Sequence, residues 1–108
     1  MERTFLVYMT ARDEAEAAAL GRLLVERRLA ACVNVIPRIA SFYWWEGELV
    51  EDREAVLVAK TAERLLRPLA EAVRGAHSYQ VPAILAFPVE HLNPAYRDWL
   101  LGELRPLG

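Results

Sequence analysis

Hydrophobic residues along the chain alternate between short apolar runs and longer stretches with helical spacing. Residues 5–9 (FLVYM) are a short apolar run, which is typical of a buried strand. From there to about residue 29, apolar residues recur every three or four positions and predict an amphipathic helix. Asp13 and Glu16 stand three residues apart, as in a capping box, and place the start of this helix beside Asp13.

The middle of the chain predicts a long β-hairpin. Residues 32–45 are rich in β-branched and aromatic residues and predict a strand, in which Pro37 requires an edge position or a bulge. Residues 46–48 (EGE) predict a turn. Residues 49–60 then return as a second strand, whose most apolar part is 55–59.

The remaining residues predict a helix, a strand and a last helix. Thr61 is placed to cap the first of these helices, and Pro68 predicts a bend or a late start. Residues 81–89 predict the final strand. Asn93 followed by Pro94 is a strong helix start. The order βαββαβ with a terminal helix predicts an α+β, ferredoxin-like fold.

The terminal helix carries an apolar stripe that predicts how it packs. Tyr96, Trp99 and Leu100 recur on one side of it, with Leu104 one turn further on. We expect Trp99 to anchor this helix in the core.

The predicted hairpin is longer than the domain from which it extends. A strand of about 14 residues reaches ~45 Å at ~3.3 Å per residue, whereas a compact domain of this length is about 35 Å across. Residues 42–45 (FYWW) lie in the distal half, where neighbouring side chains point to opposite faces. We therefore expect closed, symmetric self-association that covers these aromatic rings. The alternative is a bend at Pro37 that folds the hairpin back on its own domain.

Composition narrows the class of protein. The chain has 108 residues, of which 55% are hydrophobic and 26% charged, so residues 1–108 are expected to form a single globular domain. A net charge of -2 argues against a nucleic-acid partner. Cys32 is the only cysteine, and no apolar run is long enough for a signal-peptide core or a membrane span. These features predict a cytoplasmic protein without a membrane partner.

A few side chains are candidates for chemistry. The sequence has no HxxxH or CxxC spacing, but His77 could bind a metal together with Cys32 or Met9 and residues of a neighbouring subunit. Glu54 adjoins the apolar run of its strand, and Lys60 at the end of that strand could face an anion. Each candidate also has a simpler interpretation. His77 would be a loop histidine without a ligand, and Cys32 a buried thiol. Glu54 would belong to a solvated strand face, and Lys60 would mark an ordinary strand end.

Five segments along the chain form a recognisable series: residues 29–37 (LAACVNVIP), 41–47 (SFYWWEG), Glu54 with Lys60 and Thr61, 77–82 (HSYQVP) and 96–100 (YRDWL). Together they resemble the CutA divalent-cation-tolerance proteins. The resemblance implies a ferredoxin-like fold, a tight homotrimer whose hairpins embrace neighbouring subunits, and a link to tolerance of copper and other divalent cations. It also implies a structural likeness to PII-type signalling trimers.

This sequence departs from the family at the proposed copper ligands. Those ligands include a cysteine on the first strand and a pair of histidines. Met9 stands in place of the cysteine and Ala76 in place of the first histidine, so that His77 alone is kept. Ala83 replaces a glutamate that is common in the family. The Met9 thioether would suit at most Cu(I).

Two functions are compatible with these observations. The first is a homotrimer in divalent-cation tolerance that binds copper or another divalent cation weakly through His77. The second is a PII-like signalling or small-ligand-binding trimer that needs no metal. In that case a small anion would lie between subunits near Lys60, Tyr79 and Trp45, with Glu54 in the same cleft.

The sequence does not predict an enzyme. A phosphate-transferring enzyme on this fold would need a cradle of backbone amides, usually in a glycine-rich loop. Residues 10–13 (TARD), which follow the first strand, contain no glycine and include Asp13, which would repel phosphate.

Overall fold

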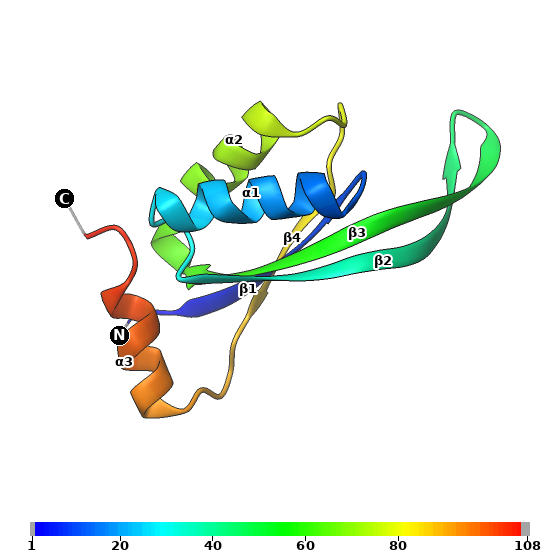
Figure 1. The fold of residues 1–108 in the computed structure, drawn as a ribbon. Helices are drawn as coiled ribbons and strands as arrows, with labels where there is room; N and C mark the ends of the chain where they lie inside the picture. The colour runs from blue at the N-terminus through cyan, green and yellow to red at the C-terminus, as the bar shows by residue number, and fades with distance from the viewer. Residues whose placement is uncertain (1, 107–108) are drawn as a thin grey trace.

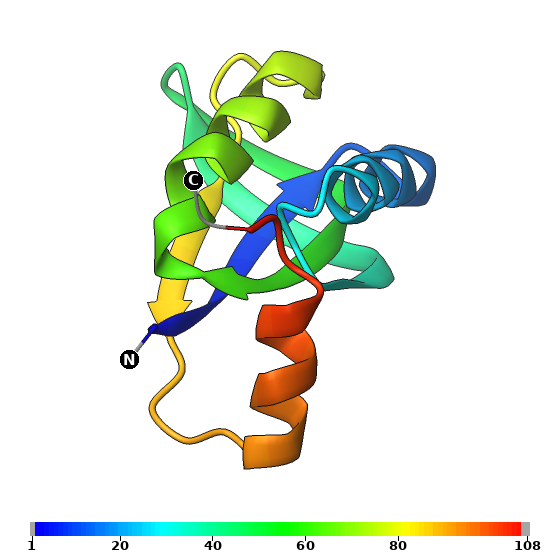
Figure 2. The same cartoon turned by 90° about the vertical axis from the view of Figure 1, so that its left-hand side faces the viewer.

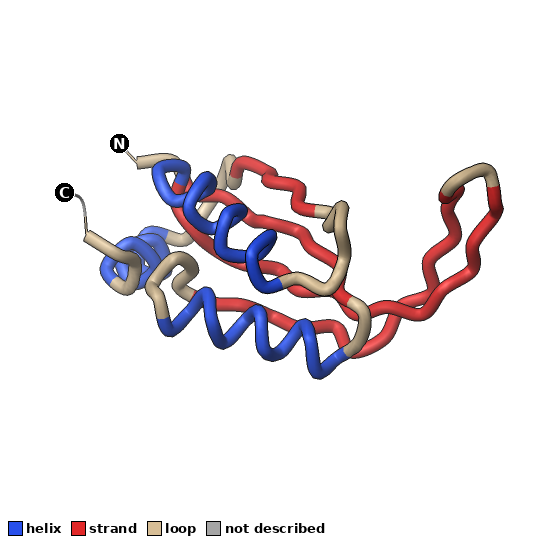
Figure 3. Tube along the Cα trace, turned by 90° about the horizontal axis from the view of Figure 1, so that it is seen from above, coloured by secondary structure: helices blue, strands red, loops and turns tan. Residues whose placement is uncertain are grey.

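The computed structural model describes residues 2–106 and places two helices over one face of a four-stranded sheet (Figure 1). Helices α1 and α2 lie side by side above the strands (Figure 3), and α3 lies at one end of the sheet, away from that helical layer (Figure 2). The predicted α+β, ferredoxin-like order with a terminal helix is confirmed. The elements are β1 (Thr4–Ala11), α1 (Glu14–Glu26), β2 (Cys32–Trp45), β3 (Glu48–Ala62), η1 (Glu63–Leu65), α2 (Leu66–Ala76), β4 (Ile84–Pro88) and α3 (Pro94–Gly102).

The sheet is antiparallel with the strand order β2-β3-β1-β4. The pairing of β2 with β3 shifts by one residue between Ile36 and Ile39, which is a β-bulge around Pro37. The prediction for Pro37 is therefore confirmed, because β2 is an edge strand and the proline lies in its bulge. One extra residue in β2 also exchanges its two faces. Odd-numbered residues face the helices before the bulge and the opposite side after it.

Alternate side chains of the strands form one core under the helices. Gly21 allows close contact between α1 and β2, since a Cβ atom at this position would lie 3.0 Å from Cγ1 of Val33. The fully buried large side chains of this core are Val7, Met9, Leu24, Leu57, Leu69 and Val73.

Two predicted helix starts are confirmed by their caps. The Asp13 side chain accepts a hydrogen bond from the backbone N–H of Glu16 at the start of α1. The Asn93 side chain accepts one from the N–H of Ala95 at the start of α3. Helix α1 ends at Glu26, a few residues earlier than predicted, and Arg28 then takes a left-handed conformation.

Three local predictions were wrong. Thr61 does not cap a helix, because β3 continues past it and its buried hydroxyl donates to the carbonyl oxygen of Leu29 at 2.7 Å. Strand β4 begins at Ile84 rather than at residue 81. Trp99 is exposed in this chain, and Leu100 instead makes the core contact of α3.

Part of the sheet face opposite α1 and α2 is exposed and apolar. In strand register, Leu6 lies beside Phe87 and Tyr8 lies beside Leu85 on this face, and each side chain is at least one-third exposed. Ile36 of β2 extends the same surface. We call this surface, formed by Leu6, Tyr8, Ile36, Leu85 and Phe87, the open face.

The hairpin of β2 and β3 extends beyond the helices that cover the body (Figure 1). The chain measures 45 × 26 × 22 Å along its principal axes. Phe42, Trp44 and Leu49 at its distal end are 66%, 72% and 65% exposed. They lie on the side of the hairpin that continues the helix-covered face, beyond the reach of α1. The prediction that the hairpin outreaches its own domain is confirmed.

Candidate functional site

The other side of the hairpin forms a wall of a large hollow. This cavity has a volume of ≈ 670 Å³. Because of the bulge, the odd-numbered residues of distal β2 and the even-numbered residues of β3 face it together. The segment before β4 closes it from the other side. The lining residues are Thr10, Ser41, Tyr43, Trp45, Val50, Asp52, Glu54, Tyr79, Gln80, Val81 and Ala83.

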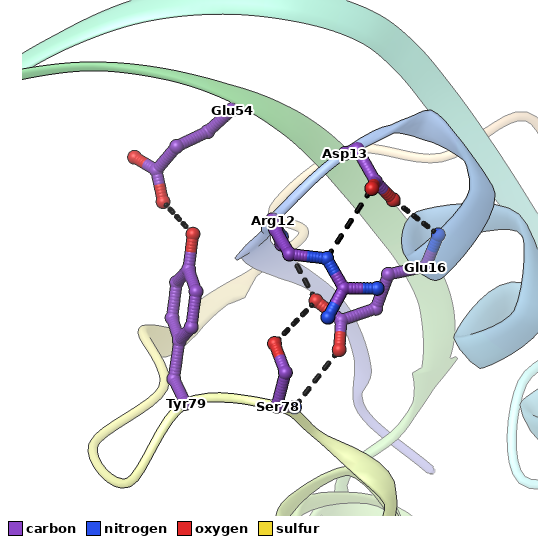
Figure 4. Close-up of polar contacts among 6 residues, drawn as sticks. All are labelled: Arg12, Asp13, Glu16, Glu54, Ser78 and Tyr79. Atoms are coloured by element: carbon purple, nitrogen blue, oxygen red, sulfur yellow. Dashed lines mark hydrogen bonds and ion pairs between the residues drawn. The ribbon is translucent and has the colours of Figure 1, made fainter.

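Two carboxylates in this cavity each accept a hydrogen bond from a tyrosine. The Tyr79 hydroxyl donates to Oε2 of Glu54 at 2.7 Å (Figure 4), and the Tyr43 hydroxyl donates to Oδ2 of Asp52 at 3.2 Å. Burial and the bond to Glu54 raise the pKa of Tyr79 well above its ordinary value. Desolvation and the charge of Asp52 raise the pKa of Tyr43. Both phenols therefore stay protonated donors.

Glu16 at the start of α1 holds the segment that carries Tyr79. Its Oε1 atom accepts hydrogen bonds from the backbone N–H of Arg12 at 2.8 Å and from the Ser78 hydroxyl at 2.9 Å. Its Oε2 atom accepts one from the backbone N–H of Ser78 at 2.8 Å (Figure 4). One carboxylate thus ties the β1–α1 loop to the segment after α2, and this fixes Tyr79 opposite Glu54.

His77 uses both ring nitrogens within the chain. Nδ1 accepts a hydrogen bond from the backbone N–H of Tyr79 at 3.0 Å. Nε2 therefore carries the proton in the neutral ring and donates it to the carbonyl oxygen of Thr10 at 2.8 Å. The imidazole joins the same two segments as Glu16, and a metal ion could reach a ring nitrogen only after one of these bonds breaks.

The predicted site residues are brought together only in part. Trp45, Glu54 and Tyr79 line one cavity. Lys60 does not line it: it lies six residues further along β3, about 20 Å away at ~3.3 Å per residue. Its ammonium group donates to the hydroxyl of Tyr96 at 3.2 Å and lies over the same ring.

The other candidate metal ligands also lie apart from the cavity. Met9 is completely buried in the core, and Cys32 is partly buried at the start of β2. Among residues 2–106, no three His, Cys, Asp or Glu side chains form a group that could hold a metal ion.

Sequence reasoning missed Asp52 and Tyr43 as partners in the cavity. Asp52 belongs to the predicted returning strand of residues 49–60, and Tyr43 belongs to the aromatic run of residues 42–45. Strict alternation from Cys32 places Tyr43 on the helix-covered face of the sheet, away from Asp52. Only the extra residue at the bulge brings the two side chains to the same face.

The comparison with protein families decides the identity of this fold. The family model described as CutA1 divalent ion tolerance protein matches residues 5–103. The chain belongs to the CutA1 family. It is 44% identical to the divalent-cation tolerance protein CutA of Thermus thermophilus over 95 residues, which are 88% of this chain and 92% of that protein.

Animal relatives of the CutA1 family are longer than this chain. A CutA homolog from Xenopus laevis is 44% identical over 99 residues, covering 92% of this chain but 65% of that protein. The mouse protein CutA is also 44% identical, and the match spans 52% of its length. The shared part thus corresponds to about half to two-thirds of these relatives.

Solved CutA1 structures share the whole architecture. The divalent cation tolerance protein from Thermus thermophilus superposes with a TM-score of 0.90 at 42% identity, covering 97% of this chain and 100% of that one. CutA1 from Oryza sativa gives a TM-score of 0.93 at 39% identity, covering 95% and 94%.

The names of CutA1 relatives refer to different cellular compartments. A rice protein is named chloroplastic, and a structure from Archaeoglobus fulgidus is named periplasmic. Within residues 2–106 of this chain, no helix has both the length and the apolar character needed to cross a membrane.

Proposed function

We propose that this protein is a homotrimer that acts in divalent-cation tolerance and that its subunits hold one another through the hairpin. The observation that carries the proposal is the distal, helix-side face of the hairpin, where Phe42, Trp44 and Leu49 are each about two-thirds exposed. Large apolar patches of this kind are typical of protein interfaces. Membership in the CutA1 family supports the role in tolerance.

The open face gives the hairpin of another subunit a surface of the same character. The two apolar surfaces lie on different parts of one chain, so contact between them joins unlike patches. Head-to-tail contacts of this type close into rings when the rotation allows. The number of three subunits follows from the resemblance to the family, and a ring covers both surfaces in every subunit.

The test of this proposal is the mass of the protein in solution. Sedimentation equilibrium at micromolar concentration is expected to give three times the mass of the chain. A folded monomer under these conditions would refute the proposal, because both apolar surfaces would then remain in water.

We further propose that copper, if bound directly, binds weakly and through His77. A metal ion must displace the bond to Thr10 or to the Tyr79 backbone, and this cost lowers the affinity. Calorimetric titration with Cu²⁺ is expected to show weak binding that His77→Ala removes. His91→Ala, at the exposed second histidine, is the matched control and should bind like the wild type. Identical isotherms for all three proteins would exclude His77.

A second candidate function is the binding of a small ligand, as in PII-like signalling trimers. The specific observation in its favour is the cavity lined by Trp45, Glu54 and Tyr79. Its volume of ≈ 670 Å³ lies within the range of small-molecule sites, and its walls are mainly apolar with a few polar groups. This function needs no metal. In the proposed assembly a neighbouring subunit on the open face would border the cavity, because Thr10 shares a face of β1 with Leu6 and Tyr8.

Both candidates are non-catalytic, and we propose the cytoplasm as the compartment. The relatives are named for divalent-cation tolerance and not for a reaction, which supports a binding role. One cysteine in the whole chain is compatible with a reducing environment. Cell fractionation and hydrolase assays on the purified protein test these two points.

A further inference from the structure

Glu54 places a largely buried carboxylate in the wall of the cavity. Its side chain is 7% exposed, and it is the one charged residue that counts as buried among residues 2–106. Oε2 accepts the Tyr79 hydroxyl, and Oε1 has no hydrogen-bond partner among the described residues. None of the ion pairs found within 4.0 Å in that part of the chain includes Glu54. Burial of an ionised carboxylate is costly unless a positive group compensates it.

The cavity is negatively charged as a whole. Asp52 and Glu54 both line it, and its lining includes no lysine, arginine or histidine. Three arginines lie on the other side of Glu54, where they line a separate hollow of ≈ 530 Å³. Two of them are paired there: Arg12 with Asp13, and Arg53 with Glu51. An anion in the cavity would be repelled, whereas a cation would gain two carboxylate partners.

The tyrosines strengthen this preference. Each hydroxyl donates a hydrogen bond to a carboxylate. Asp52 and Glu54 are thereby held in place and keep further acceptor positions free. Because the phenols are neutral donors, they orient the carboxylates without removing the negative charge.

The side chains that line the cavity indicate the chemistry of the remaining part of the ligand. Trp45, Val50 and Val81 give the cavity an apolar surface, and the indole face can also attract a cation. A bare metal ion would leave most of ≈ 670 Å³ unfilled, and no three suitable ligands are grouped among residues 2–106.

We propose that this cavity binds a small organic cation, whose ammonium or amidinium group is held by Glu54 and Asp52 and whose hydrocarbon part lies against Trp45. This inference rests on the small-ligand candidate function above and reverses the expected charge of its ligand, which the sequence suggested to be an anion. Glu54 is then the residue that selects the charge.

Three probes of similar shape and different charge test the proposal on the assembled protein. We expect 2-phenylethylamine to bind at least about 10-fold more tightly than 2-phenylethanol or 3-phenylpropanoate, in calorimetry or by a change in tryptophan fluorescence. Glu54→Gln should weaken the amine by roughly 10- to 100-fold. Glu71→Gln removes the same charge from an exposed position of α2 outside the cavity, and should leave the affinity within about twofold.

Sedimentation of the same samples separates this inference from the proposed assembly. An intact trimer that binds none of the probes, or prefers the anion, overturns the organic-cation site alone. Amine binding that is unchanged in Glu54→Gln also overturns it. If Glu54→Gln does not fold, Asp52→Asn replaces it, with a loss of about 10-fold expected from the second carboxylate.

Discussion

Replacing both Phe42 and Trp44 by serine is expected to convert the proposed trimer into folded monomers. These side chains are 66% and 72% exposed in the chain, so their loss removes little packing within the subunit. Full burial of a large apolar side chain is worth ~1.5–3 kcal/mol. Losing two of them at each subunit contact should weaken association by roughly 10²- to 10⁴-fold. Sedimentation velocity over a range of concentrations measures this change.

A matched control separates this effect from a general loss of surface hydrophobicity. Val25→Ser replaces an apolar residue of α1 that is 41% exposed and lies outside both proposed contact surfaces. This variant should remain trimeric. Circular dichroism should show the same fold for all three proteins. A Phe42/Trp44 double variant that still sediments as a trimer would show that the hairpin does not hold the assembly.

Glu16→Gln is expected to lower the free energy of unfolding by about 1–2 kcal/mol at pH 7. The carboxylate accepts three hydrogen bonds, from the Arg12 backbone and from the backbone and hydroxyl of Ser78. An amide would turn N–H hydrogens toward one of these donors. The loss is modest because part of the carboxylate is in contact with solvent.

The effect of Glu16→Gln should depend on pH in a defined direction. Partial burial opposes ionisation of Glu16, but the bonds from Arg12 and Ser78 outweigh it and lower its pKa below the ordinary value of 4.5. A lowered pKa in the folded state stabilises the protein above the unfolded value, and this contribution is lost as the pH falls through the folded pKa. The difference between wild type and variant should therefore shrink from pH 7 toward about pH 3.

Urea unfolding at fixed protein concentration measures both effects of Glu16→Gln. Glu14→Gln is the control, since Glu14 lies in the same first turn of α1 but is exposed. It should change the free energy of unfolding by less than about 0.5 kcal/mol at either pH. A Glu16 variant that behaves like the Glu14 variant would show that the bonds to Ser78 do not stabilise the fold.

The sequence was sufficient for features that depend on the order and length of elements. The caps at Asp13 and Asn93 require only local spacing, and the reach of the hairpin follows from the number of residues before its turn. The place of Pro37 could also be predicted, because a missing N–H restricts a strand residue wherever it occurs.

Features that depend on neighbours in space could not be predicted from the sequence. The apolar stripe of the short helix α3 did not show that Leu100 is buried while Trp99 stays exposed. Lys60 and Glu54 were predicted to share a cleft between subunits; within one chain they lie in different parts of β3, and the sequence does not show which residues a neighbouring subunit brings to either of them. The approach of Tyr79 to Glu54 depends on Glu16 and His77, which connect loops more than sixty residues apart in the chain.

The bulge at Pro37 determines which aromatic side chains of the hairpin face the cavity and which lie on its other side. With it, Tyr43 and Trp45 turn toward Glu54, while Phe42 and Trp44 turn away. A chain shorter by one residue between Ile36 and Ile39 would exchange the two sets. Phe42 and Trp44 would then face the cavity, and Tyr43 and Trp45 would lie on the other side of the hairpin. For the engineering of this hairpin, the length of that short stretch is therefore as decisive as the identity of the rings.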